Sequence, residues 1–347
     1  MRLRLWILVV IVCLGLVPAQ PKPLTLMPPA AGQLYHGVYP GTDSGNEDDM
    51  QPSDLEAYEA AVGRRAAVVY FSNNWYNGRG FPAETAAWIR ARGAVPYVRL
   101  MLRSDSEINR PEPLYTLEAI LRGDFDADLR AWGQTARAFG TPVMVEWGTE
   151  MNGRWFSWNG VWNGGAGKGP EKFRQAYRKL VGIMNTQGAT NLIWVWHVNA
   201  GDDPDAAWNR LENYYPGGDV VDWLAVSVYG GQTPRDPNWP PFAERMDEVI
   251  PRLSKLAPTK PVLVAEFGAT AGNPRGTPDA WANAALTALL SNRWPSVRGF
   301  SWWNEAWPND NNPAHNTEMR VQKIPALAAV FRKQLASSKV LERPLFK

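Results

Sequence analysis

Residues 83–101, AETAAWIRARGAVPYVRLM, join two structural patterns in one short stretch. Ala83–Arg92 is amphipathic, as expected of a helix that covers a core, and Gly93 stands where a helix commonly ends. Val95–Met101 has the mostly apolar composition of a short buried strand. A helix that leads into a strand is one unit of an α/β fold, so the fold depends on how often the chain repeats it.

The same alternation runs through most of the chain. Eight strand candidates are apolar, β-branched or aromatic: Leu34–Tyr39, Ala66–Ser72, Val95–Met101, Val143–Trp147, Leu192–Val198, Val221–Tyr229, Val262–Phe267 and Val297–Trp303. The helix candidates between and after them are Ser53–Val62, Ala83–Arg92, Ala127–Phe139, Glu171–Thr186, Phe242–Leu256, Asp279–Ser291 and Lys323–Ser337, with a short one near Asp205–Asn213. Eight such units predict an α/β protein with a single (β/α)8 TIM barrel rather than an open sheet.

The first residues have the pattern of an export signal. Arg2 and Arg4 precede the apolar run Trp6–Val17, and small residues follow up to Ala19. The run has about twelve residues, too few to span a bilayer. We therefore expect a signal peptide at 1–19, an unstructured Pro-rich leader at 20–33 and a catalytic domain at 34–340. The protein is expected to be secreted, extracellular or periplasmic, with no membrane attachment after cleavage. A lipoprotein cysteine at Cys13 is the alternative, which its bulky neighbours disfavour.

Charge and composition narrow the class of partner. Loss of Arg2 and Arg4 takes the formal charge from +2 to zero, and nucleic acids and anionic membranes both demand a basic surface. We therefore expect an uncharged substrate, no nucleic acid partner, no cofactor and a monomer. His36 and His315 lack the spacing of metal ligands, so no catalytic metal is expected. The acidic loop Asp43–Asp49 could hold calcium, although we favour a solvated loop.

Two glutamates stand where a barrel enzyme keeps its chemistry, at the carboxyl ends of strands. Glu150 follows the fourth predicted strand and Glu266 closes the seventh. Hydrolysis of a glycosidic bond needs two carboxyl groups, and the fourth and seventh strands face each other across a barrel. A retaining enzyme holds the two groups about 5–5.5 Å apart, and we expect that separation here.

Aromatic and polar residues near the strand ends suggest a sugar-binding surface. The sequence contains 18 tryptophans, and exposed aromatic faces stack on sugar rings, whereas any single tryptophan can equally be core filler. We expect Trp155, Trp158 and Trp162 to form a platform. His197 bonds either to a sugar or to the acid/base, or only caps its strand. The other candidate substrate-binding residues are Tyr229, Asn199, Trp75, Trp302 and Trp303.

Residues 149–158, TEMNGRWFSW, resemble the acid/base motif of glycoside hydrolase family 26, and residues 264–268, VAEFG, resemble its nucleophile motif. Residues 221–229 resemble its sixth strand, which ends in a tyrosine bonded to the nucleophile. The resemblance runs over 34–335 and implies that Glu150 is the acid/base and Glu266 the nucleophile of a double displacement. It also implies endo attack on a β-linked polysaccharide. β-1,4-Mannan is the commonest substrate in this family, and β-1,3-1,4-glucan and β-1,3-xylan are alternatives.

Two residues depart from the family pattern. Thr149 replaces a histidine and Glu146 replaces an arginine, and both family residues help to orient the carboxylates. We expect Glu146 to lie level with Glu150 or deeper, paired with an arginine such as Arg99, and to raise the pKa of the acid/base. The departures leave open a catalytically altered barrel that only binds an exopolysaccharide. An aldolase-like barrel is disfavoured because no lysine or metal cluster marks the strand ends.

Overall fold

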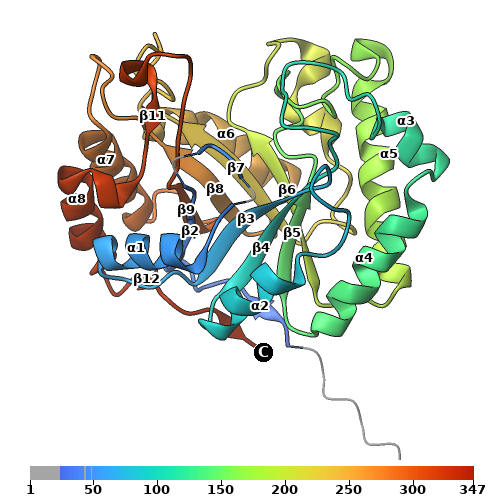
Figure 1. The fold of residues 1–347 in the computed structure, drawn as a ribbon, viewed down its shortest axis with the longest axis horizontal. Coiled ribbons are helices and arrows are strands. Elements are labelled where there is room, and N and C mark those ends of the chain that lie inside the picture. The colour runs from blue at the N-terminus through green and yellow to red at the C-terminus, as the bar shows by residue number, and fades with distance from the viewer. Residues whose placement is uncertain (1–23, 43, 48) are drawn as a thin grey trace, which may run out of the picture.

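The computed structural model describes residues 24–347 except 43 and 48, so the predicted signal peptide lies outside the described residues. Eight parallel strands form a closed barrel at its centre (Figure 1): β2 Leu34–Tyr39, β3 Val68–Asn74, β4 Val95–Met101, β5 Val143–Trp147, β6 Leu192–Asn199, β7 Trp223–Tyr229, β8 Val262–Gly268 and β9 Val297–Trp303. Each strand pairs with the next, and β2 pairs with β9, which closes the ring. The predicted TIM barrel is confirmed.

Helices surround the strands (Figure 1): α1 Pro52–Val62, α2 Ala83–Ala91, α3 Leu117–Arg122, α4 Asp126–Phe139, α5 Gly165–Thr186, α6 Phe242–Leu256, α7 Pro278–Leu290 and α8 Pro325–Leu335. Every predicted long helix forms, and all but one lie within two residues of their expected bounds. Helix α5 begins at Gly165 instead of Glu171, and α3 was not predicted. The weak fifth unit is two short 3-10 helices, η1 Ala207–Asn209 and η2 Leu211–Tyr214, instead of an α-helix.

Helix α7 illustrates why these segments form where they do. The Thr277 side chain accepts a hydrogen bond from the Ala280 backbone N–H, and Pro278 stands in the first turn, where its missing N–H costs nothing. The helix buries Trp281, Leu286 and other residues of one face. Complete burial of one leucine side chain contributes about 1.5–3 kcal/mol, so packing on the barrel outweighs local propensity.

Part of the predicted leader pairs with the folded domain. We expected residues 20–33 to be unstructured, but Leu26–Met27 form strand β1, which pairs antiparallel with β13, Leu345–Phe346. The Tyr35 hydroxyl donates to the Met27 carbonyl and accepts from the Leu345 N–H. Strand β12, Val340–Leu341, extends the main sheet beside β2. The expectation is therefore wrong for this part of the leader, because the last residues of the chain provide it with a pairing edge.

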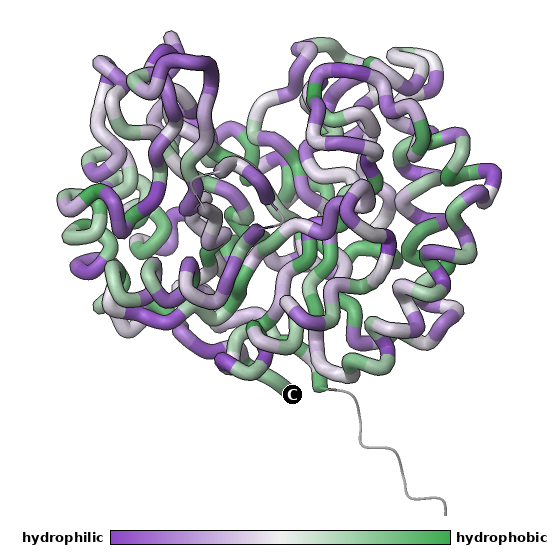
Figure 2. The backbone as a smooth tube through the Cα atoms, in the orientation of Figure 1, coloured by the Kyte–Doolittle hydropathy of each residue, from purple (hydrophilic) through white to green (hydrophobic). Residues whose placement is uncertain are grey.

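The loops that follow the barrel strands lie at the top in Figure 1, and the C-terminus lies at the bottom. One of these loops carries β10 Ala306–Trp307, η3 Pro313–His315, β11 Thr317–Glu318 and η4 Val321–Lys323. Hydrophilic stretches recur in the upper loops, while apolar stretches follow the central strands (Figure 2). Among the described residues, no helix has the length and apolar character needed to cross a membrane.

Candidate active site

Glu266 lies on β8 where the sheet is irregular. The register of β8 shifts against β7 and again against β9 around this residue, and such bulges re-aim side chains near active sites. The Glu266 side chain is buried with 3% of its surface exposed. Tyr229 at the end of β7 donates to its Oε2 at 2.9 Å, as the sequence predicted. The Tyr70 hydroxyl lies 3.2 Å from Oε1 and the Arg99 Nε 3.8 Å.

Glu150 is held differently, in a turn just after β5. Its φ is +52°, in the left-handed region that non-glycine residues seldom adopt. Its backbone N–H donates to the His197 carbonyl at 2.9 Å, which ties the turn to β6. Its Oε2 accepts from the indole N–H of Trp155 at 2.6 Å. A Cβ on Gly153 would lie 2.2 Å from the Trp155 ring, so only glycine there lets the indole lie in this position.

Both glutamates line one pocket of about 690 Å³, together with Trp155, Asn199, Tyr229 and Trp303. A second pocket of about 710 Å³ adjoins it. The two share the lining residues Ile108, Phe156, Trp303 and Trp307, so they form one groove across the barrel mouth. A groove of this kind suits an extended polymer better than a small molecule.

Burial sets the electrostatics of the pocket. It raises the pKa of Glu266 to about 7; the Arg99 guanidinium opposes this, while the Glu150 carboxylate adds to it. The hydrogen bond from Tyr229 favours the ionised form of Glu266, but desolvation and like charge outweigh one hydrogen bond.

Below the pocket, Glu146 occupies a fully buried polar cluster. It accepts hydrogen bonds from the hydroxyls of Tyr70 and Tyr97, and His197 Nδ1 lies 2.8 Å from its Oε2. The Arg99 Nε is 3.9 Å away, so the expected arginine partner is present at the margin of an ion pair. Burial raises the pKa of Glu146, but the His197 charge and these hydrogen bonds outweigh burial and leave the pKa lowered.

His197 belongs to this cluster and not to the pocket. Its ring contacts Thr149 Oγ1 at 3.0 Å and Ser227 Oγ at 2.8 Å in addition to Glu146. Burial lowers the pKa of His197, but the Glu146 carboxylate outweighs burial and leaves the pKa raised. The expectation of a sugar contact is therefore wrong, because both ring nitrogens are occupied and the residue is buried. Thr149 directly precedes Glu150 in the chain, so its contact connects this ring to the turn that carries Glu150.

Ligand atoms of Glu146, His197 and Glu266 lie within 4.8 Å of one another, a spacing that could suit a metal ion. The cluster is already satisfied internally, because Glu146 accepts from two tyrosines and contacts His197. A metal would have to displace these bonds, so the donor set fits a hydrogen-bonded support better than a metal centre.

The structure separates the predicted aromatic residues. Trp155 and Trp303 line the groove, and Trp303 stacks on Tyr39 with ring centroids 3.9 Å apart. Trp162 is 37% exposed, but it lines neither groove pocket. Three others are buried and line neither pocket, which corrects their assignment as sugar contacts: Trp75, Trp158 and Trp302.

Each of these three buried tryptophans has a packing role. The Trp302 indole donates to the Met319 carbonyl, and Trp158 stacks on Phe156 while donating to the Thr149 carbonyl. Trp75 packs edge-on against Tyr115. The core-filler alternative, weighed for every tryptophan, therefore holds for these three.

Some residues in or beside the groove were not predicted from the sequence. Tyr70 lies within a predicted strand and contacts Glu266, while Glu305 and Trp307 follow the last predicted strand and line the groove. The rule that function gathers at strand ends could have identified Glu305, which comes two residues after Trp303. Tyr70 gave no such signal, because it lies inside its strand.

Residues 119–265 match the sequence model of glycosyl hydrolase family 26. Endoglucanase H of Acetivibrio thermocellus is 24% identical over 293 residues, 83% of this chain and 29% of that protein. Mannan endo-1,4-beta-mannosidase of Thermothelomyces thermophilus is 36% identical over 89 residues, 25% of this chain and 15% of that protein. The chain thus spans less than a third of the length of either relative.

Solved structures share the fold over most of the chain. The Bacillus subtilis mannanase BCman superposes with a TM-score of 0.61 at 20% sequence identity, covering 91% of this chain and 88% of that one. The barrel, the matched segment and the strand-end motifs agree with one another. Residues 119–265 are therefore similar to glycosyl hydrolase family 26, and the solved structures share the fold of the whole barrel.

Proposed function

We propose that the protein is a retaining endo-β-glycanase that hydrolyses a β-linked polysaccharide by double displacement. One observation carries the proposal: the carboxyl groups of Glu150 and Glu266 line a single pocket and interact strongly enough for the charge of one to raise the pKa of the other. Cleavage of a glycosidic bond with retention needs two carboxyl groups on either side of one bond.

In this proposal Glu266 is the nucleophile. Its anionic form attacks the anomeric carbon, and Tyr229 and Arg99 hold its two oxygens on opposite sides. Glu150 is the acid/base, which donates a proton to the departing glycosidic oxygen and later removes one from water. The first step needs a proton on Glu150 and an ionised Glu266, because one group must donate and the other must attack.

The groove supports endo attack on a chain. Its two pockets join through shared residues, and aromatic side chains such as Trp155, Trp303 and Trp307 recur along it. Aromatic faces and hydroxyl-binding groups suit an uncharged polysaccharide. β-1,4-Mannan is the first substrate we propose, since the relative with 36% identity is a mannan endo-1,4-beta-mannosidase.

A second candidate is a mixed-linkage β-1,3-1,4-glucan. The similarity to an endoglucanase over 83% of the chain favours it. The replacement of the family arginine and histidine by Glu146 and Thr149 also changes the support of the catalytic residues, which is a reason to test beyond mannan. β-1,3-Xylan belongs in the same comparison.

The test is hydrolysis of purified mannan, β-1,3-1,4-glucan, β-1,3-xylan and β-1,3-glucan, with the product anomer followed by proton NMR during the first minutes. We expect one polymer to be cut internally and the β-anomer to appear first. An α-anomer first would mean inversion and would overturn the roles of both glutamates. Binding to a polymer without any cleavage would favour the catalytically altered barrel instead.

We also propose that residues 1–19 are a cleaved signal peptide and that the 34–340 domain acts outside the cytoplasm as a monomer. N-terminal sequencing of protein recovered from the medium or periplasm should begin near Gln20. Recovery of a chain that still begins at Met1 would contradict export with cleavage.

A further inference from the structure

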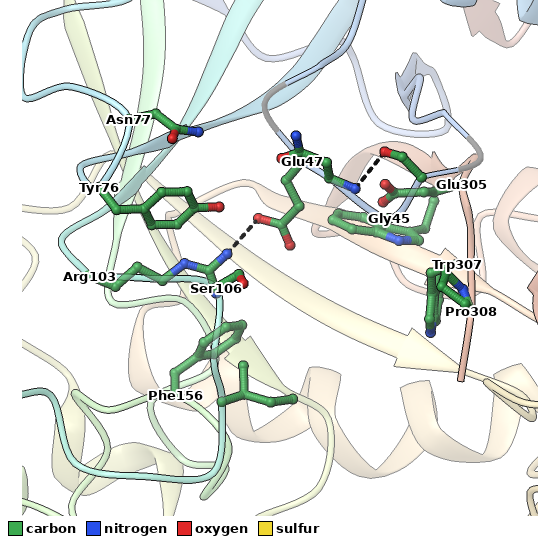
Figure 3. Close-up of a pocket in the computed structure, with 14 residues that line it drawn as sticks. Gly45, Glu47, Tyr76, Asn77, Arg103, Ser106, Phe156, Glu305, Trp307 and Pro308 are labelled. Atoms are coloured by element: carbon green, nitrogen blue, oxygen red, sulfur yellow. Dashed lines mark hydrogen bonds and ion pairs between the residues drawn. The ribbon is translucent and has the colours of Figure 1, made fainter. Parts of the chain in front are cut away.

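The second pocket of the groove contains a carboxyl group that the reaction does not use. Figure 3 shows Glu305 on one side of it, facing the cavity across from Glu47, Arg103 and Tyr76. Glu305 follows β9, and Trp303 just before it lines both pockets. A molecule that extends from the catalytic pocket past Trp303 would therefore reach Glu305.

Glu305 is buried, and one of its two carboxyl oxygens is without a hydrogen-bond partner among the described residues. Only 2% of its surface is exposed, and the oxygen in question is Oε1. A Cβ at position 41 would lie 2.6 Å from its side chain, so Gly41 leaves the space that this carboxyl fills. A buried polar atom without a partner costs about 1–3 kcal/mol, which a ligand could recover by bonding to it.

Glu47, on the opposite wall of this pocket, differs from Glu305 in having charged and polar partners. Glu47 accepts from Arg99 at 2.8 Å and from Ser72 at 2.9 Å, and Arg103 lies 3.4 Å away. Despite burial, these partners lower the pKa of Glu47 to about 2. Glu305 Oε1 has no such partner among the described residues. Burial, followed by the Glu47 charge, holds the pKa of Glu305 well above its usual range although the Arg99 charge opposes this.

A carboxyl that keeps its proton is both a hydrogen-bond donor and an acceptor. Sugar hydroxyls have the same two capacities, so a neutral acid can bond to them without placing an unpaired charge in a buried wall. Arg103 is also committed, since its Nε donates to Asn74 at 2.8 Å. The free polar capacity of this wall therefore suits an uncharged sugar ring.

We propose that the Glu305 carboxyl group hydrogen-bonds to a hydroxyl of a sugar residue next to the cleaved unit and so determines which chains the groove accepts. The proposal rests on the proposed function, because it assumes a glycan in the catalytic pocket. It assigns Glu305 to substrate recognition and to no step of the bond cleavage.

The test compares Glu305→Ala with Glu305→Gln on oligosaccharides of two and four units from the polymer that the wild type degrades. An amide donates and accepts as a protonated acid does. We expect Glu305→Ala to lower kcat/KM on the tetrasaccharide about tenfold more than on the disaccharide. Glu305→Gln should restore most of that loss. Glu342→Ala makes the same change outside the groove and should alter neither value.

Binding provides a second measurement that does not need turnover. In a Glu266→Ala background, tetrasaccharide binding followed by tryptophan fluorescence should weaken about tenfold on Glu305→Ala and much less on Glu305→Gln. Equal losses on both oligosaccharides, or a Gln variant as poor as the Ala variant, would overturn the role of Glu305. Failure of the wild type to cleave any polymer while the binding differences persist would instead overturn the proposed function alone.

Discussion

The two proposed catalytic glutamates have opposite kinds of support. Glu266 is fixed by side chains of separate barrel strands, Tyr70 on β3, Arg99 on β4 and Tyr229 on β7. Glu150 lies in a turn and takes its side-chain hydrogen bond from Trp155, five residues along the same loop. The barrel as a whole thus positions one carboxyl, while a local loop positions the other, so mutations should affect the two in different ways.

The largest effect expected is loss of the carboxyl groups themselves. Glu266→Ala should abolish turnover of every substrate, because no other group can form the glycosyl intermediate, and azide should restore slow cleavage with inverted product. Glu150→Ala should lower turnover of a natural polysaccharide about 100- to 10,000-fold. It should spare the first step on an aryl glycoside with a good leaving group, which would give a burst, and azide should then yield a retained β-glycosyl azide.

These two variants separate the roles by stopped-flow kinetics and by NMR of the azide products. Equal residual activity of both variants on polysaccharide and aryl glycoside would contradict the assignment. Circular dichroism of each variant serves as the folding control.

The next largest effect should come from removing a hydrogen bond that a barrel strand supplies to Glu266. Tyr229→Phe removes a hydrogen bond to a charged group, worth about 1.5–3 kcal/mol, and should slow glycosyl-enzyme formation roughly 10- to 100-fold. Tyr97→Phe is the matched control, since its hydroxyl donates to Glu146. Pre-steady-state release of an aryl leaving group measures both. A Tyr97 effect as large as that of Tyr229 would mean that the whole cluster, and not the direct bond, positions the nucleophile.

Removing the hydrogen bond that Trp155 donates to Glu150 should have a smaller effect. Trp155→Phe keeps an aromatic face and removes the indole donor, so we expect about a tenfold loss of kcat/KM, mainly for substrates that need acid assistance. Trp155→Ala should add a rise in KM through loss of the sugar contact. The comparison uses one aryl glycoside and the natural polymer. Unfolding of the Ala variant at 25 °C would show that this tryptophan is chiefly a packing residue.

The smallest effect concerns stability and pH. The pKa of Glu266 is about 7 in the folded chain against an ordinary value of 4.5, so the folded state holds the proton more tightly. Stability should therefore fall as pH rises from about 4.5 to about 7, and Glu266→Gln should remove this penalty. We expect the variant to be more stable than the wild type by about 1–3 kcal/mol at pH 8 and equal to it at pH 4.

Thermal unfolding at both pH values measures this difference as a Tm shift of a few degrees. Glu342→Gln, at a half-buried position outside the groove, is the control for loss of a carboxyl group elsewhere. A Glu266→Gln shift that is the same at pH 4 and pH 8 would rule out titration of this carboxyl as the cause.

Much of the fold follows from local pattern. Four of the eight barrel strands, such as Val95–Met101 and Val143–Trp147, have the predicted bounds because a parallel strand buried on both faces gives a continuous apolar run. The helix expected near Asp205–Asn213 was wrong because two short 3-10 helices, η1 and η2, occupy this segment. Such short segments show no α-helical repeat of apolar residues in the sequence. Strand β1 was missed because its partner, β13, lies more than 300 residues away.

The site was harder to predict because neighbouring residues on a strand point in opposite directions. Trp302 and Trp303 are adjacent, yet one is buried against helix α8 through Phe331 and the other lines the groove. The sequence placed both at the strand end and could not say which faced inward. The prediction of a sugar contact for His197 was wrong for a related reason. Its ring points into the barrel, but it hydrogen-bonds to Glu146 and Ser227 below the pocket.

Strands β1 and β13, the first and last of the described strands, pair with each other at the bottom of the barrel, away from the groove. Through Tyr35 the same pair is attached to β2 itself. A dye, a bead or an immobilising tag joined after Lys347 would therefore sit on the underside, with the opening directed outward. Such an attachment gives the protein a fixed orientation on a sensor surface, with its mouth accessible to long chains in solution.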